Sequence, residues 1–237
     1  MIWVGTSGYN YPEWRGSFYP PGFPTSQMLP FYVKHFSTVE INYTSYHFPT
    51  QKSVLGWMAE TPGEFKLALK VPRRLTFTQP GPKTGGLMRT FCELAALLGP
   101  KQAPILMQLP PGMPREIEHL RKLLEVLPEG PDVAIELRDA SWHTDDVYDL
   151  LRSRRVAMCI SDSEELQTPL VQTSHFSYFR LRHEGYMDAD VERWAGHVAA
   201  TRGDAYVYFK HEGTGSGPRY AALLMQHLGL PRPGPAG

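Results

Sequence analysis

Eight short apolar segments recur at fairly even spacing along the chain, and nearly every one ends in polar or charged residues. Stretches with helical periodicity separate most of them. Strands that alternate with helices are typical of a parallel sheet, and eight such units are typical of a (β/α)8 barrel. We therefore expect one α/β domain, a TIM-type barrel with outer helices, over residues 1–230, and a disordered tail over residues 231–237.

A doubly wound open sheet is the alternative architecture, but it predicts a glycine-rich first turn. The sequence contains neither a GxGxxG nor a GxxxxGK[ST] motif, so we expect no nucleotide cofactor. The expected strands cover residues 2–6, 38–42, 65–71, 104–111, 133–138, 156–161, 176–181 and 204–209. The expected helices cover residues 26–35, 51–60, 87–98, 117–127, 145–151, 191–200 and 220–228, with an aromatic loop over 43–48 and a long loop up to about residue 86.

Charge and cysteine content exclude several classes of protein. The 24 Lys and Arg residues equal the 24 Asp and Glu residues in number, so no global field favours nucleic acid, which stays an alternative that we do not favour. Cys92 and Cys159 have no CxxC spacing and are expected to be buried hydrophobes. No apolar run is long enough for a membrane span and no signal peptide is evident, so we expect a cytoplasmic protein without membrane contact.

The fifth expected strand places a carboxylate and a guanidinium side by side. Val133, Ile135 and Leu137 alternate with Glu136 and Arg138, so the apolar set faces one side and the charged pair faces the other. Since catalytic groups of such barrels lie at the C-terminal ends of strands, we interpret Glu136 and Arg138 as site residues.

The ends of the other strands supply further site candidates. Carboxylates among cations suit general acid/base chemistry because their neighbours shift their pKa values apart. The catalytic candidates are Glu40, Lys70, Glu136 and Asp162. The candidates for substrate binding are Ser7, Tyr9, Asn42, Gln108, Arg138, Trp142, Arg180, Arg182, His183 and Lys210. These groups predict an enzyme acting on a small anionic substrate, phosphorylated or carboxylated, which the arginines would bind.

Three alternatives stay open at this point. Glu40, Glu136, Asp162, His183 and His211 are ligand types for Zn²⁺, Mn²⁺ or Mg²⁺, which would fit a metal-dependent phosphodiesterase or isomerase. A non-catalytic ligand-binding barrel is the second alternative. The third is a self-neutralising network of ion pairs that closes the top of the barrel without any ligand. The aromatic segment over residues 9–24 fits either a packed loop or a stacking wall over a ligand.

The chain resembles the YecE-like proteins, domain of unknown function 72. The matching residues are Gly5-Thr6-Ser7-Gly8-Tyr9, Trp14, Phe18-Tyr19-Pro20, Val39-Glu40-Ile41-Asn42, Tyr46, Lys70, Gln108-Leu109-Pro110-Pro111, Glu136-Leu137-Arg138, Ser141-Trp142 and Asp162. The resemblance implies a TIM-type barrel but no established reaction. The chain departs from the family pattern after strand seven, at Arg182-His183, and after strand eight, at Lys210-His211-Glu212.

Overall fold

The computed structural model describes residues 1–213 and 215–232. Its eight strands are all parallel and lie in one sheet in the order β3-β2-β1-β8-β7-β6-β5-β4. Their bounds are β1 (Ile2–Ser7), β2 (Thr38–Ile41), β3 (Lys66–Leu69), β4 (Ile105–Gln108), β5 (Val133–Glu136), β6 (Ala157–Asp162), β7 (Phe176–Leu181) and β8 (Asp204–Phe209). The eight strands agree with those expected from the sequence to within a few residues.

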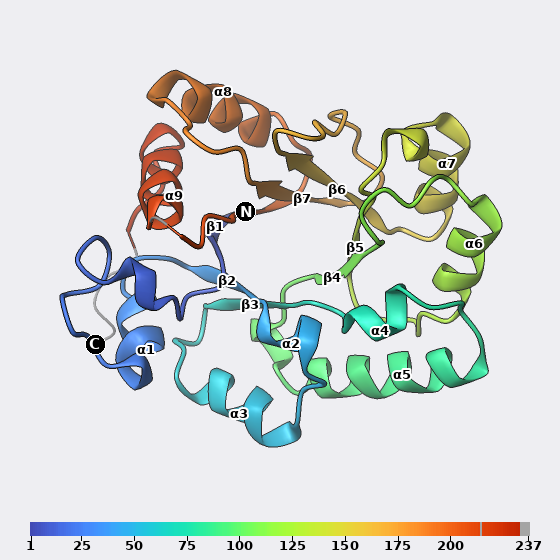
Figure 1. Cartoon of the computed structure of the whole chain (residues 1–237), viewed down its shortest axis with the longest axis horizontal. Coiled ribbons are helices and arrows are strands. Elements are labelled where there is room, and N and C mark those ends of the chain that lie inside the picture. Colours follow the sequence, from blue (N-terminus) through green and yellow to red (C-terminus); the bar gives the residue numbers. More distant parts are fainter. Residues whose placement is uncertain (214, 233–237) are drawn as a thin grey trace.

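The two edges of this sheet, β3 and β4, lie next to each other. The Val71 amide donates to the Leu106 carbonyl at 2.8 Å, and the Ala103 amide donates to the Leu67 carbonyl at 3.0 Å. These contacts bring the sheet round into a nearly closed cylinder, and Figure 1 shows helices around the strands. The fold is therefore the (β/α)8 TIM-type barrel that the sequence predicts.

The α-helices follow the strands around the outside of the barrel. Their bounds in the described residues are α1 (Met28–Tyr32), α2 (Tyr43–Tyr46), α3 (Gln51–Ala59), α4 (Arg73–Thr76), α5 (Pro82–Ala96), α6 (Ile117–Glu125), α7 (Asp145–Ser153), α8 (Asp188–Ala199) and α9 (Ser216–His227). None of them combines the length and the apolar character that a membrane span requires.

Alternation along the strands divides the core in two. In β5, Val133 and Ile135 belong to the large apolar cluster shared with the helices, whereas Ala134 belongs to a second cluster inside the barrel. Trp3 and Tyr206 stack within that second cluster, with ring centroids 4.7 Å apart. Small and aromatic side chains therefore fill the part of the barrel interior near the strands' N-terminal ends. The charged residues occupy the part near the C-terminal ends.

Three local predictions were wrong. Residues Arg73–Thr76, expected as part of a long loop, form the short helix α4. Residues Tyr43–Tyr46, expected as an aromatic loop, form the short helix α2. Helix α5 begins at Pro82, about five residues before the expected start. Gly85 and Gly86 lower helix propensity in this turn, but a Cβ on Gly85 would already lie 3.5 Å from Val126. Close packing against Val126 thus compensates for the low helix propensity of this turn. Of the expected tail, residues 233–237 lie outside the described part.

Candidate active site

Parallel register brings the polar strand ends to one level of the barrel. Ser7 on β1 is the register partner of Glu40 on β2, and Gln108 on β4 is the partner of Glu136 on β5. Residues in register on the inner face of parallel strands lie close together. Arg180 on β7 reaches both carboxylates from across the barrel, so the strand ends form one connected cluster.

Glu40 is fully enclosed by hydrogen bonds. Its Oε1 accepts hydrogen bonds from the Ser7 hydroxyl and from Arg180 Nη2, the latter at 2.9 Å. Its Oε2 accepts from the Tyr178 hydroxyl at 2.8 Å and from Arg180 Nε at 3.0 Å. Burial alone would raise the pKa of Glu40, but Arg180 and Lys70 lower it below its usual range. The surroundings of Glu40 therefore favour its ionised form, and donors already occupy both of its oxygens.

Glu136 has three guanidinium groups around it. Oε2 accepts hydrogen bonds from Arg180 Nη1 and, at 2.6 Å, from Gln108 Nε2. Oε1 lies 3.2 Å from Arg182 Nη1 and 3.6 Å from Arg138 Nε. Burial would raise the pKa of Glu136, but the three arginines together lower it to about 2.

Three arginines contact the two carboxylates of the cluster, which leaves one excess positive charge among these groups, and Glu165 beside Arg138 offsets part of it. Arg180 is shared between Glu40 and Glu136, so Arg138 and Arg182 have no carboxylate of their own in the cluster. Burial and the two neighbouring arginines lower the pKa of Arg138, although Glu136 opposes them. Since like charges at close range repel, an additional anion between these guanidinium groups would be stabilising.

A cavity of about 280 Å³ opens beside Arg138 and Arg182. We call it the guanidinium pocket; besides the two arginines its lining includes Glu136, Gly112, Ser161, Ser163 and Glu165. The two arginine side chains are about one-fifth exposed, 21% and 19%. They can therefore contact a ligand that enters from solvent.

Lys70, directly after β3, differs from every other charged group of the cluster. Its residue is 4% exposed, and among the described residues its ammonium makes no hydrogen bond and no ion pair within 4.0 Å. Burial, together with the charge of Arg180, lowers the pKa of Lys70 to about 7, although Glu40 and Glu136 favour the charged form. Near neutral pH this amine is present in both protonation states.

The cluster brings together most of the residues that the sequence predicted for the site. Ser7, Glu40, Gln108, Glu136, Arg138, Arg180 and Arg182 are joined by direct contacts. Asn42 joins through Ser7, whose oxygen accepts from Asn42 Nδ2 at 3.0 Å. Lys210 lies at the rim, 34% exposed and 3.5 Å from Glu212.

Four predicted residues are not in the cluster. Asp162 faces helix α8, where it accepts hydrogen bonds from Tyr186 at 2.7 Å and from Trp194 Nε1 at 3.1 Å. Trp142 is fully buried and donates to the Met113 carbonyl at 2.8 Å. His183 is nearly half exposed on the loop after β7. Tyr9 lies nearby, in a separate cavity described below.

Sequence reasoning missed two members of the site. Tyr178 donates to Glu40, and Tyr11 donates to the Ser7 carbonyl at 2.9 Å and accepts from Asn42 Nδ2 at 3.0 Å. Tyr178 stands two positions before Arg180 on the same strand face, and that period of two was the available signal. No comparable signal identified Tyr11, because it lies in irregular chain.

The metal-ligand types of the sequence do not converge. Within residues 1–213 and 215–232, no group of three His, Cys, Asp or Glu side chains is arranged to hold a metal ion. Glu40 and Glu136 are each bound by Arg180, and Asp162 faces the helices. The described geometry thus gives the metal-dependent alternative no ligand set.

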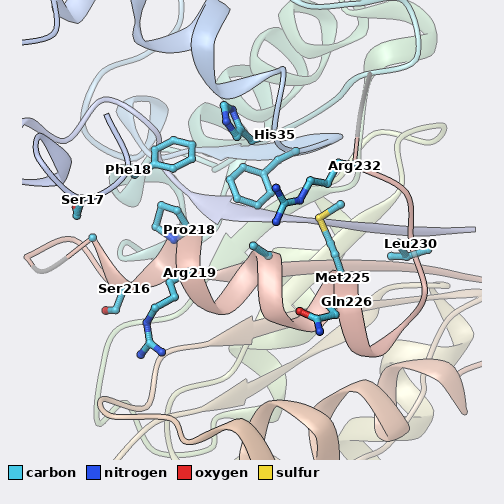
Figure 2. Close-up of a pocket in the computed structure, with 13 residues that line it drawn as sticks. Ser17, Phe18, His35, Ser216, Pro218, Arg219, Met225, Gln226, Leu230 and Arg232 are labelled. Atoms are coloured by element: carbon cyan, nitrogen blue, oxygen red, sulfur yellow. The ribbon is translucent and has the colours of Figure 1, made fainter. Parts of the chain in front are cut away.

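A larger cavity, about 660 Å³, lies away from this cluster, between α9 and the chain segments that contain Phe18 and His35. Figure 2 shows Phe18 and His35 across from Pro218 and Met225 of α9. It contains none of the buried charged groups described above, so we place the candidate site in the barrel interior.

Together the fold and the cluster define a TIM-type barrel with a buried group of arginines and carboxylates at the C-terminal face of its strands. The chain belongs to the family described as "Protein of unknown function DUF72", whose sequence model matches residues 3–236. The family resemblance noted in the sequence is thereby confirmed.

Curated relatives and solved structures agree with this assignment. The UPF0759 protein YecE of Escherichia coli K12 is 28% identical over 139 residues, which cover 58% of this chain and 48% of that protein. The UPF0759 protein YunF of Bacillus subtilis is 27% identical over 157 residues, covering 63% and 55%. The chain thus spans about half the length of the curated relatives it matches. The structure of the DUF72 protein TM1631 from Thermotoga maritima superposes with a TM-score of 0.82 at 25% identity, covering 97% of this chain and 99% of that one.

Proposed function

We propose that this chain is an enzyme that catalyses proton transfer on a small anionic substrate, phosphorylated or carboxylated, at the C-terminal face of the barrel. Arg138 and Arg182 bind the anionic group in the guanidinium pocket. Lys70 is the acid/base group. The observation that carries the proposal is the state of Lys70, a buried amine without a hydrogen-bond partner among the described residues, next to guanidinium groups that exceed the carboxylates.

Lys70 suits this role because its pKa, lowered to about 7, lies near a neutral working pH. A general acid or base is most effective when its pKa is close to the pH at which it acts. Glu40 and Glu136 do not suit it, since their pKa values are lowered and their oxygens are occupied by strong donors. In this proposal the two carboxylates position Arg180 and stabilise the surrounding cations.

The arginine pair supports an anionic substrate over a neutral one. Arg138 and Arg182 share a single oxygen of Glu136 and line a pocket that is open to solvent. Guanidinium groups bind phosphate and carboxylate oxygens with two parallel hydrogen bonds. A bound anion would neutralise the excess charge, whereas a neutral ligand would leave it in place.

The proposal is tested with a panel of sugar phosphates and small carboxylates, assayed for turnover between pH 6 and 9. Lys70→Met should lower turnover by about 100-fold or more, and the matched control Lys52→Met, at an exposed lysine on α3, should have no effect. Arg138→Gln should raise KM with a smaller change in kcat. Full turnover in Lys70→Met would contradict the role of Lys70, and binding without turnover would favour a non-catalytic barrel.

A further inference from the structure

A second cavity opens at the same face of the barrel, next to the cluster. It has a volume of about 260 Å³ and is lined by Gly8, Tyr9, Asn10, Ile41, Asn42, Tyr43, Ser53 and Trp57. No Lys, Arg, Asp or Glu is among these residues, and three of them are aromatic. We call it the aromatic pocket. Its chemistry is thus opposite to that of the guanidinium pocket.

The aromatic walls are held in place by contacts with one another. The side chain of Trp57 on α3 lies near the Tyr9 hydroxyl, and the rings of Tyr43 and Trp57 meet edge to face with centroids 6.3 Å apart. Tyr43 is nevertheless 53% exposed. Exposed aromatic rings that are fixed by their neighbours provide stacking surface at low entropic cost.

Asn42 connects this pocket to the cluster and has unused acceptor capacity. The Ser7 hydroxyl has one hydrogen, which it donates to Glu40, while its oxygen accepts from Asn42 Nδ2 and from Arg180 Nη2 at 3.2 Å. The side-chain carbonyl of Asn42 lies 3.1 Å from the same hydroxyl oxygen and receives no hydrogen from it once that hydrogen is on Glu40. A ligand N–H or O–H in the aromatic pocket would satisfy this carbonyl.

The two pockets lie at opposite positions in the strand order, and Lys70, which lines neither cavity, follows a strand that lies between them. The aromatic pocket is built after β1 and β2, and the guanidinium pocket after β4 to β7. Lys70 follows β3, which lies between β2 and β4 around the barrel. A hydrogen-bonded series runs from Asn42 through Ser7, Arg180 and Glu136 to Arg182.

We propose that the aromatic pocket binds a planar ring of the same substrate whose anionic group occupies the guanidinium pocket. The substrate is therefore a ring-bearing anion with a hydrogen-bond donor on the ring, and its reacting part lies between the two ends, at Lys70. This inference rests on the proposed function, because the anionic end is assigned there.

The test compares two compounds that share the phosphate end and differ in the ring. Isothermal titration calorimetry of the full chain with adenosine 5′-monophosphate and with ribose 5-phosphate measures what the ring contributes. We expect the ring-bearing compound to bind at least about tenfold more tightly, as stacking of a base on aromatic side chains allows. Tyr43→Ala, at an exposed position, should reduce this ratio several-fold, and Trp57→Phe should preserve most of it.

The outcomes separate this inference from the proposed function. Equal affinity for the two compounds would overturn the ring subsite and leave the anion site intact. An unchanged ratio in both Tyr43→Ala and Trp57→Ala would also overturn it, since the ring would then bind elsewhere. Arg182→Gln should weaken both compounds by the same factor. If neither compound binds at millimolar concentration, both proposals fail.

Discussion

Glu40 and Glu136 are the same side chain held by the same guanidinium, yet their surroundings differ. Glu40 is enclosed by Ser7, Tyr178 and Arg180, and each of its oxygens accepts two hydrogen bonds. Glu136 faces a cavity on its other side and is contacted there by two partly exposed arginines. A buried ion pair gives little net stability over apolar packing. In the function that we propose, the contacts of Glu136 with Arg138 and Arg182 serve ligand binding, and Glu40 orients Arg180 toward Glu136.

The largest expected effect comes from the group that both carboxylates share. Arg180→Met should lower the free energy of unfolding by about 3–5 kcal/mol, because it leaves two buried carboxylates without their main partner. Urea denaturation at pH 7 measures this loss. It should shrink at acidic pH, where Glu40 and Glu136 can take up protons in the variant. A loss that stays the same at pH 4 and pH 7 would show that the charges are not its cause.

The next effect tests the difference between the two carboxylates directly. Glu40→Gln should destabilise the protein by about 3 kcal/mol, since the new amide N–H group must face Arg180 or the Tyr178 and Ser7 hydroxyls in a closed site. Glu136→Gln should cost about 1–2 kcal/mol, because Arg138 and Arg182 can turn toward solvent. Denaturant titration of both variants side by side provides the measurement.

Equal losses of unfolding free energy in Glu40→Gln and Glu136→Gln would contradict the distinction between the enclosed Glu40 and the accessible Glu136.

Phosphate binding gives a second comparison of the two carboxylates. Glu136→Gln should strengthen binding of inorganic phosphate, because it removes the anion that competes for the same arginines. Glu40→Gln should change phosphate binding much less, since it lies outside the guanidinium pocket.

The smallest effect concerns Lys70 and has a defined sign with pH. Its folded-state pKa of about 7 is below the ordinary value of 10.5, so between these pH values the unfolded chain binds more protons than the folded one. The contribution of Lys70 to the free energy of unfolding therefore rises as the pH increases from about 7 to about 10.5, and it is lowest below pH 7. Lys70→Met should raise the free energy of unfolding at pH 6.5 by about 1–2 kcal/mol.

The measurement for Lys70 is thermal or urea unfolding of both proteins at several pH values. The advantage of Lys70→Met should decline as the pH rises toward 10, since the amine of the native protein is then neutral. An advantage that is independent of pH would point to packing rather than charge. The exposed control variant Lys52→Met should follow the native protein throughout.

The sequence predicted the position of the site, at the C-terminal ends of the strands, better than it predicted the contacts within the site. Period two along the strands put Glu136 with Arg138, and Arg180 with Arg182, on common faces, and the structure joins these groups in one cluster. Position at a strand end, and not period two, grouped Asp162 with them, although its side chain faces α8. Period two places Asp162 with Met158 and Ile160, which belong to the cluster shared with the helices, so alternation along this strand was the signal against it.

The aromatic positions show the same limit. Trp142 follows a site strand directly, yet it is buried among helices and loops, whereas Tyr43 and Trp57 lie in elements that gave no functional signal. Tyr11 joins the site from irregular chain. Side chains on loops and helices are placed by tertiary packing, for which the local sequence contains no periodic pattern.

By itself the sequence determined the barrel, because eight alternations of strand and helix leave few ways to bury their apolar faces. It also determined that charged residues gather at one face, because parallel strands all end on the same side. Only the tertiary structure decided that Arg180 bridges the two carboxylates and that Lys70 remains without a partner among the described residues. Those facts depend on distances across the barrel, which are set by its closure and not by any local pattern in the chain.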